Sequence, residues 1–160
     1  MRLLIRMTIG ALLIDQISKY LVVFRMGLDR VQAIDVWPPF LNLRYGENRG
    51  INFGLFTGET DWARWVLTGF SLVVVVAVVY WVWRWHRKSW QMMISAGLLI
   101  GGALGNVADR LYHGYVLDFL NMSCCGLNNP FVFNVADVFI FGGVAGLVLF
   151  DGNLGRKKAK

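Results

Sequence analysis

The sequence predicts an all-α membrane protein with four transmembrane helices and a small β-rich extracytoplasmic subdomain between the first and second helices. Three observations support this fold class. Hydrophobic residues make up 56% of the 160 residues, against roughly 45–50% in an ordinary soluble domain. Four segments are long and apolar, and basic residues gather at only a few places in the chain. We therefore expect one integral membrane domain covering residues 1–160.

The four apolar segments are candidate membrane spans, because crossing a bilayer takes about 20 helical residues, with roughly 17 as the lower limit. The first segment has a basic start, as a cleaved signal peptide would. However, Asp15 and Lys19 interrupt it and no small-residue cleavage site follows, so we interpret it as a retained helix. The predicted spans are residues 3–24, 62–85, 92–111 and 134–150.

Basic residues set the expected orientation, because cytoplasmic loops are enriched in Lys and Arg. They cluster at the amino end, after the second span and in the C-terminal tail, while four arginines are spread over the longer segment 25–61. Both termini are therefore predicted to be cytoplasmic. This orientation explains the net charge of +6. The basic residues form no stripe with interleaved aromatics, so we expect no nucleic-acid partner.

The segment 25–61 differs in texture from the spans. Apolar and polar residues alternate from Phe40 to Tyr45, directly after the proline pair, and glycines punctuate the chain beyond them. This pattern predicts a strand-and-turn subdomain on the outer side. Its aromatic residues suit a surface half-sunk in lipid headgroups. They are Trp37, Phe40, Phe53 and Phe56.

Polar residues of the predicted spans fall in the half of the membrane nearest the outer surface. Ionisable groups inside a membrane are costly and are usually functional, so their concentration on one side favours a site over scattered snorkelling side chains. Asp118 is expected in the loop after the third span, at the same surface. The others are Asp15 and Lys19 in the first span, Asn106, Asp109 and Arg110 in the third, and Asn134 and Asp137 at the start of the fourth.

Small residues at a spacing of four let membrane helices approach closely. The third span has Gly97, Gly101 and Gly105 at this spacing, and Gly142 and Gly146 repeat it in the fourth. We therefore expect the third and fourth helices to pack together, which would bring their polar residues close to one another. Within the third span, Arg110 could pair with its neighbour Asp109, or it could hold the two acids or a substrate carbonyl in place. We expect the ion pair, because an unpaired Arg in low dielectric is costly.

Two carboxylic acids that share one proton can hydrolyse an amide. The ionised acid takes a proton from water while the neutral acid donates to the carbonyl oxygen. Repulsion between like charges keeps one of the pair protonated, and the two titrate as a coupled system. Asp118 and Asp137 meet this requirement if folding brings them together, and Asn134 supplies an amide beside them.

Other chemistries have weaker support. His86 and His113 are predicted at opposite surfaces, so we expect no metal site and no cofactor. His113 with Ser123 lacks the Gly-x-Ser-x-Gly turn of a nucleophile elbow. Cys124 and Cys125 are expected to be small apolar loop residues, because adjacent α-carbons lie about 3.8 Å apart and disulfides favour about 4.4–6.8 Å.

Two non-proteolytic readings remain open. A proton-coupled carrier would need acidic groups at several depths of the membrane, including the midplane. The inner halves of the four predicted spans are nearly free of them. An assembly factor would use the polar cluster to dock a partner helix, and replacing Asp118 or Asp137 by Asn would then weaken binding without abolishing a reaction.

Five motifs, taken together, resemble lipoprotein signal peptidase, the type II signal peptidase of bacteria. The resemblance runs through almost the whole chain, and the order of the motifs makes it specific. The segment 120–132 matches no motif of the family. The five are DQISK at 15–19, NRGINFG at 48–54, GGALGNVADR at 101–110, VLDF at 116–119 and FNVAD at 133–137.

The resemblance implies an aspartyl endopeptidase of the bacterial inner membrane that cuts prolipoproteins immediately before a diacylglyceryl-modified cysteine. Its partners would be these prolipoproteins and membrane lipid, and we expect a monomer. By the resemblance, Asp118 and Asp137 are the catalytic pair, Asp15 and Lys19 support the first helix, and residues 50–56 form a mobile cover. Residues around the pair that would bind substrate or support the site are Asn48, Gly50, Asn106, Asp109, Arg110 and Asn134.

Overall fold

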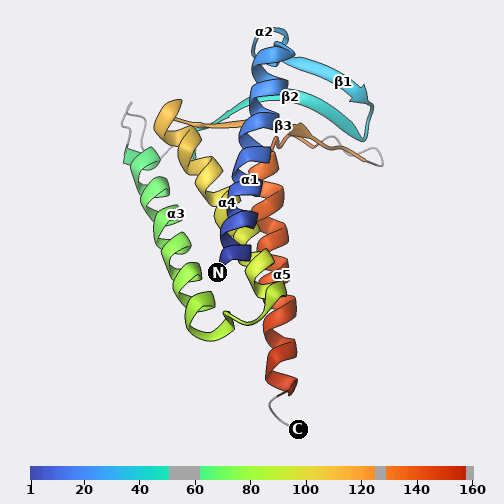
Figure 1. Cartoon of the computed structure of the whole chain (residues 1–160). Helices are drawn as coiled ribbons and strands as arrows, with labels where there is room; N and C mark the ends of the chain where they lie inside the picture. The colour runs from blue at the N-terminus through green and yellow to red at the C-terminus, as the bar shows by residue number, and fades with distance from the viewer. Residues whose placement is uncertain (51–61, 125–128, 158–160) are drawn as a thin grey trace.

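The computed structural model describes residues 1–50, 62–124 and 129–157, and of residues 152–157 only the backbone. Four long helices form a bundle, and a small sheet covers one end of it (Figure 1). The first and second long helices each end in a stretch of π-helix, and a single helical turn precedes the sheet. The helices are α1 (Arg2–Lys19), η1 (Tyr20–Arg25), α2 (Leu28–Val31), α3 (Trp62–Trp81), η2 (Val82–His86), α4 (Trp90–Tyr112) and α5 (Val135–Lys157).

Three helical stretches of the described chain are long and apolar enough to cross a membrane: Arg2–Arg25, Trp62–His86 and Trp90–Tyr112. They correspond to the first three predicted spans, so this protein is a membrane protein. The outer face of α3 is strongly apolar, with Phe70 and Val73 about two-thirds exposed, as expected of a surface that faces lipid. The fourth predicted span corresponds to α5, and its crossing of the membrane stays a prediction.

The two ends of the bundle are built from different parts of the chain (Figure 1). The start of α1, the end of α5 and the α3–α4 connection lie at one end. The sheet lies at the other end, where α1 and α4 finish and α5 begins. The basic segments at the amino end and after α3 are therefore on the same end of the molecule, opposite the sheet.

The sheet has three antiparallel strands in the order β1-β2-β3. One of these strands comes from outside the predicted β-rich segment 25–61. Strands β1 (Ala33–Trp37) and β2 (Leu41–Asn48) lie in the predicted subdomain between the first two spans. Strand β3 (Val116–Asn121) comes from the segment after α4 and pairs with β2, Gly46 opposite Asp118. The β-rich subdomain is thus not confined to residues 25–61.

Asp118 therefore lies on a strand, and our placement of it in a loop was wrong. Strand β3 is buried along most of its length, with Val116, Leu117 and Phe119 each no more than 2% exposed. A strand buried on both faces shows no alternation of apolar and polar residues, which is the signal that revealed β2. Pairing with β2 decides its conformation, and that contact is distant in sequence.

Glycines bring α4 against both of its main neighbours, but only partly as predicted. A Cβ built on Gly101 would lie 2.6 Å from Ala11 Cβ and from Thr8 O, and Gly97 and Gly105 meet α1 in the same way. The spacing-four stripe thus packs mainly against α1. The expected packing of α4 against α5 is confirmed, and it uses Gly102, which meets the Ala136 carbonyl, together with Gly143 and the predicted Gly146, which meet Ser95. Gly142 has no neighbour within 4 Å of such a Cβ.

Several smaller expectations can be placed. Trp37 and Phe40 are 68% and 46% exposed at the β1–β2 turn, which leaves them free to enter lipid, whereas Phe53 and Phe56 lie outside the described residues. The predicted cover, residues 50–56, also lies outside them except for Gly50. Cys124 is disulfide-bonded, so its expected role as a simple apolar residue was wrong. Cys125 lies outside the described residues.

Replacing Gly101 by Ala should destabilise the protein by about 1–3 kcal/mol, because the added methyl overpacks the α1–α4 contact. Gly69→Ala is the matched control, since its methyl meets nothing within 4 Å and Ala favours a helix by about 0.5–1 kcal/mol. Thermal unfolding in detergent measures both. Equal midpoints for the two variants would show that the Gly101 contact is not tight.

Candidate active site

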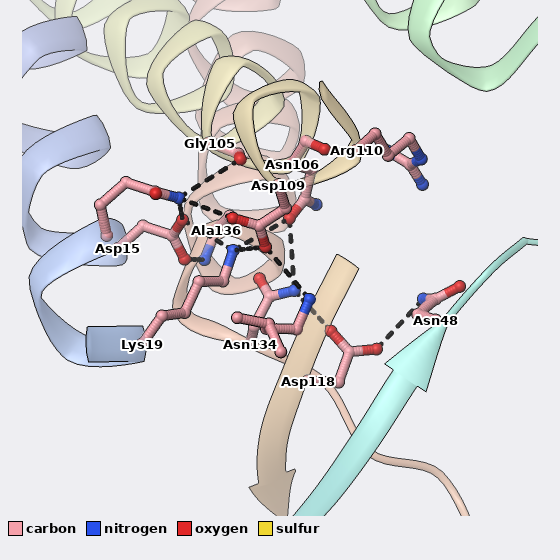
Figure 2. Close-up of polar contacts among 12 residues, drawn as sticks. Asp15, Lys19, Asn48, Gly105, Asn106, Asp109, Arg110, Asp118, Asn134 and Ala136 are labelled. Atoms are coloured by element: carbon pink, nitrogen blue, oxygen red, sulfur yellow. Dashed lines mark hydrogen bonds and ion pairs between the residues drawn. The ribbon is translucent and has the colours of Figure 1, made fainter. Parts of the chain in front are cut away.

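The site lies at the sheet end of the bundle, where β3, α4 and the start of α5 meet. Asp118 on β3 is only 3% exposed, and each of its carboxylate oxygens accepts a hydrogen bond from an asparagine amide. Asn134 Nδ2 donates to Oδ1 at 2.5 Å and Asn48 Nδ2 donates to Oδ2 at 3.1 Å. Figure 2 shows this carboxylate between β3, β2 and Asn134. Donors from two elements therefore fix its orientation.

Asp137 belongs to a reciprocal cap at the start of α5. Asn134 precedes the helix, and its Oδ1 accepts from the Asp137 N–H at 3.0 Å, while its own N–H donates to Asp137 Oδ2 at 3.3 Å. This is the geometry of a capping box, with Asn at the N-cap and Asp three residues later. Asp137 is half-buried, so water can reach it. The cap fixes Asp137 through the same asparagine that holds Asp118.

Asn106 on α4 completes the bridge between the acids. Its Nδ2 donates to Asp137 Oδ1 at 2.9 Å, and its Oδ1 accepts from Asn134 Nδ2 at 3.3 Å. Each of the two carboxylates thus has two N–H donors, and Asn134 contributes to both. The structure brings Asp118, Asp137, Asn106, Asn134 and Asn48 into one hydrogen-bonded group.

A buried ionic cluster lies directly behind this group. Lys19 Nζ forms ion pairs with Asp15 Oδ2 at 2.8 Å and with Asp109 Oδ2 at 2.7 Å, and it lies 3.4 Å from Asn106 Oδ1. All three ionic side chains are almost fully buried. A carboxylate or ammonium survives in such a place only when it is paired, which the cluster achieves by joining α1 to α4.

The predicted pair of Arg110 with Asp109 is wrong. Among the described residues Arg110 has no carboxylate within ion-pair distance, and its Nη1 donates to the Asn106 carbonyl at 3.3 Å. Consecutive residues of a helix point in directions about 100° apart, so Asp109 faces Lys19 while Arg110 extends to the other side (Figure 2). Arg110 therefore remains available near the acids.

Sequence reasoning did not single out Gln16, although it lies inside the first motif. Its Nε2 donates to Asp15 Oδ2 at 3.1 Å and to Asp109 Oδ1 at 2.9 Å, so it also joins the two carboxylates that Lys19 bridges. The signal was present: an amide beside an aspartate within an apolar span. Gly50 lies near the site, with φ of 100°, and its N–H donates to Asn48 Oδ1 at 3.1 Å.

Burial raises the pKa of Asp118 from 3.8 to about 6, because the charged form loses hydration. Hydrogen bonds from Asn134 and Asn48 and the charge of Lys19 oppose this effect, while the negative charge of Asp137 adds to it. Asp118 is thus able to retain a proton much closer to neutral pH than an ordinary aspartate. A half-buried acid beside it completes the requirements for general acid–base chemistry.

The described residues contain no group of three His, Cys, Asp or Glu side chains able to hold a metal ion. The donors around Asp118 and Asp137 are amides and one guanidinium. The groups at hand are thus two carboxyls with positioned amide donors, at the end of a membrane-embedded bundle. Such a site has the constituents needed to activate water and to protonate a carbonyl or an amine.

Comparison with known proteins identifies the family of this membrane protein. The family described as signal peptidase (SPase) II matches residues 7–151. A lipoprotein signal peptidase of Alteromonas mediterranea is 39% identical over 150 residues, covering 94% of this chain and 80% of the relative. That of Caulobacter vibrioides is 40% identical over 145 residues, covering 90% and 82%. A solved bacterial membrane enzyme has a TM-score of 0.77 at 27% identity, covering 98% of this chain and 90% of its own.

The chain belongs to the signal peptidase II family, whose members are proteases of the aspartic type. The family resemblance inferred from the five motifs is confirmed.

The raised pKa of Asp118 predicts a pH-dependent loss of stability. The folded protein binds this proton more tightly than the unfolded chain, so the contribution is greatest below pH 3.8 and falls as pH rises towards about 6. Relative to Asp118→Asn, the wild-type free energy of unfolding should fall by up to about 3 kcal/mol between pH 3.5 and 7. Denaturant unfolding in detergent at both pH values measures this.

Asp35→Asn is the matched control, because Asp35 is exposed and lies away from the site, paired with Arg44 at 2.8 Å. Its pH dependence should follow that of the wild type. Parallel curves for wild type and Asp118→Asn would contradict the raised pKa.

Proposed function

We propose that this protein is an aspartyl endopeptidase that removes signal peptides from diacylglyceryl-modified prolipoproteins, cutting before the lipidated cysteine. Asp118 and Asp137 form the catalytic dyad and water is the nucleophile. One observation carries the proposal: both carboxylates are hydrogen-bonded to the buried Asn134, which unites two acids from different elements. The name shared by the relatives, lipoprotein signal peptidase, supports the substrate class.

The proposed chemistry needs no covalent intermediate. The ionised member of the dyad takes a proton from water, whose oxygen attacks the scissile carbonyl carbon. The neutral member donates its proton to the carbonyl oxygen, giving a tetrahedral diol. When the carbon–nitrogen bond breaks, a proton passes from the dyad to the leaving amine. The dyad acts as one coupled system through the cycle.

Neighbouring residues have distinct proposed roles. Amide donors from Asn48, Asn106 and Asn134 orient the carboxylates, and those of Asn134 and Asn48 favour the ionised form of Asp118. Arg110 lies near both acids and has no ion-pair partner within the described part of the chain, so its guanidinium has N–H groups to offer a substrate carbonyl. Gly50 holds the backbone that presents Asn48, and its positive φ disfavours other residues.

We propose that the dyad lies near the periplasmic leaflet of the bacterial inner membrane, with both termini cytoplasmic. In this arrangement α5 is a fourth span, residues 1–160 form one integral domain, and the sheet rests on the outer surface. A substrate anchored by a signal helix and acyl chains stays within the same bilayer, so it reaches the dyad by lateral diffusion. The enzyme acts as a monomer in this proposal. Water enters from the headgroup side.

The carrier alternative has less support from the structure. The buried ionisable side chains of the described chain, Asp15, Lys19, Asp109 and Asp118, all lie at the sheet end. A conduit would need ionisable groups along the length of the bundle. A single cluster at one end suits a reaction centre instead.

Asp118→Asn and Asp137→Asn should each lower cleavage of a diacylglyceryl-modified prolipoprotein by at least about 10³-fold, because each removes one half of the acid–base pair. The measurement is appearance of the free signal peptide with purified protein in detergent. Asp35→Asn, on the exposed edge of the sheet, should retain wild-type activity. Substantial cleavage by either dyad variant would rule out the mechanism, and inhibition by a chelator would indicate a metal-dependent one.

Orientation can be tested with reporters. A reporter active only in the cytoplasm, fused after Lys160, should be active, and one inserted at the β1–β2 turn should be inactive, because the proposal places these on opposite sides of the membrane. A reporter active only in the periplasm should give the reverse pattern. A periplasmic signal from the C-terminal fusion would overturn the proposed side of the dyad.

A further inference from the structure

We propose that Asp15 and Asp109, joined by Lys19, are positioning residues that set the spacing of the dyad through the two backbone amides that precede it. Asp15 holds the amide of Ala136, next to Asp137. Asp109 holds the amide of Leu117, next to Asp118. The inference rests on the proposed function of the two acids, and it assigns the buried ionic cluster a task beyond supporting the first helix.

The first connection joins α1 to the start of α5. Asp15 Oδ1 accepts the Ala136 N–H at 2.9 Å, as Figure 2 shows. The first amides of a helix have no partner within it, and Ala136 lies in this first turn, buried completely. Asp15, itself fully buried, supplies the missing acceptor. The carboxylate thereby fixes the turn that presents Asp137.

The second connection joins α4 to the start of β3. Asp109 Oδ2 accepts the Leu117 N–H at 3.1 Å. Leu117 is 2% exposed and Asp109 is equally buried, so no water competes for the amide. One strand residue further on, Asp118 points towards Asn134 and Asn48. The position of Asp118 along β3 is therefore tied to α4 as well as to its strand partner.

Lys19 turns two separate contacts into one clamp. Two ionised carboxylates buried close together would repel each other. The Lys19 ammonium, within 2.8 Å of Asp15 and 2.7 Å of Asp109, offsets this repulsion and holds both carboxylates in place. Gln16 bridges the same carboxylates from another side. A single basic residue therefore couples the turn holding Asp137 to the strand holding Asp118.

The clamp is tightly packed, so it can be disturbed by a substitution next to it that leaves Asp15, Lys19 and Asp109 unchanged. A Cβ built on Gly105 would lie 2.6 Å from Asp15 Oδ2 and 3.3 Å from Asp15 Cγ. Gly105→Ala should therefore push the Asp15 carboxylate away from Ala136. Gly142→Ala on α5 is its matched control, because its methyl meets nothing within 4 Å.

Amide hydrogen exchange, followed by NMR of the full-length protein in micelles, measures the two contacts directly. In the wild type the Ala136 and Leu117 amides should both be protected. Asp15→Asn and Gly105→Ala should speed exchange at Ala136 by about tenfold or more relative to Leu117, and Asp109→Asn should do the reverse, because each removes or weakens a hydrogen bond to a charged acceptor. Gly142→Ala should match the wild type at both amides.

Cleavage kinetics on the lipidated substrate give the second readout. Each clamp variant should lower kcat by about tenfold or more, with KM changed less than about twofold, because misplacing a catalytic group slows chemistry without removing a substrate contact. Lys19→Met should also speed hydrogen exchange at both the Ala136 and the Leu117 amides. Lys19→Arg, which keeps the charge, should recover part of the kcat.

The outcomes separate this inference from the proposed function. Protected amides that respond selectively, in a protein whose Asp118→Asn and Asp137→Asn variants still cleave, would sustain the clamp geometry but overturn its link to catalysis. Unprotected amides in the wild type, equal acceleration of both amides in every variant, or a change in KM alone would overturn the clamp. If a variant fails to fold, the wild-type protection of Ala136 and the Gly105→Ala comparison still decide.

Discussion

The pairing of buried charge is the constraint on which the rest of this structure depends. Asp15, Lys19 and Asp109 are almost fully removed from solvent, and breaking one such pair costs about 3–5 kcal/mol by leaving an unpaired charge. The three side chains come from α1 and α4, so these helices have one acceptable register against each other. Glycines allow that register, because Gly101 and Gly105 bring the α4 backbone against α1. Charge pairing and close packing thus select the same arrangement.

The candidate site combines structural and chemical roles in the same residues. Asn134 and Asp137 cap α5 by exchanging hydrogen bonds, and Asn134 also holds Asp118. A capping residue is well placed because the first turn of a helix carries a partial positive charge that favours a carboxylate. The residues that supply hydrogen-bond partners at the start of α5 therefore also align the two acids. Loss of one cap disturbs both stability and geometry.

How far the sequence predicts this protein depends on the range of the signal. Long apolar segments predicted the three helices that are long and apolar enough to cross a membrane, and alternation from Phe40 predicted β2, because both patterns are local. Strand β3 was missed since it is buried on both faces and owes its conformation to β2. The partner predicted for the Gly97–Gly101–Gly105 stripe was wrong for a related reason. The spacing of small residues indicates that a helix packs closely, but it does not indicate which neighbour it packs against.

The site residues show the same division. The motifs named every residue of the hydrogen-bonded group, yet the pair assigned to Asp109 was wrong. Adjacency in sequence suggested Arg110, whereas helix geometry turns the two side chains apart and gives Asp109 to Lys19. The contacts that join α1 to α5 and α4 to β3 run to backbone amides, and a sequence shows side chains only. Such contacts become visible once the fold is known.

The position of the site at the end of the bundle follows from the membrane itself. Within hydrocarbon, backbone amides must be satisfied inside a helix, so strand ends and helix starts are tolerated only where polar partners or water are present. The sheet end supplies both: asparagine amides from β2, α4 and the α5 cap, and a half-exposed Asp137. A hydrolytic reaction needs water as a reactant, while its acids need enough burial to hold a proton near neutral pH. The proposed position of the dyad near a membrane surface would meet these demands together, and the proposed clamp of Asp15, Lys19 and Asp109 would keep the irregular backbone in place.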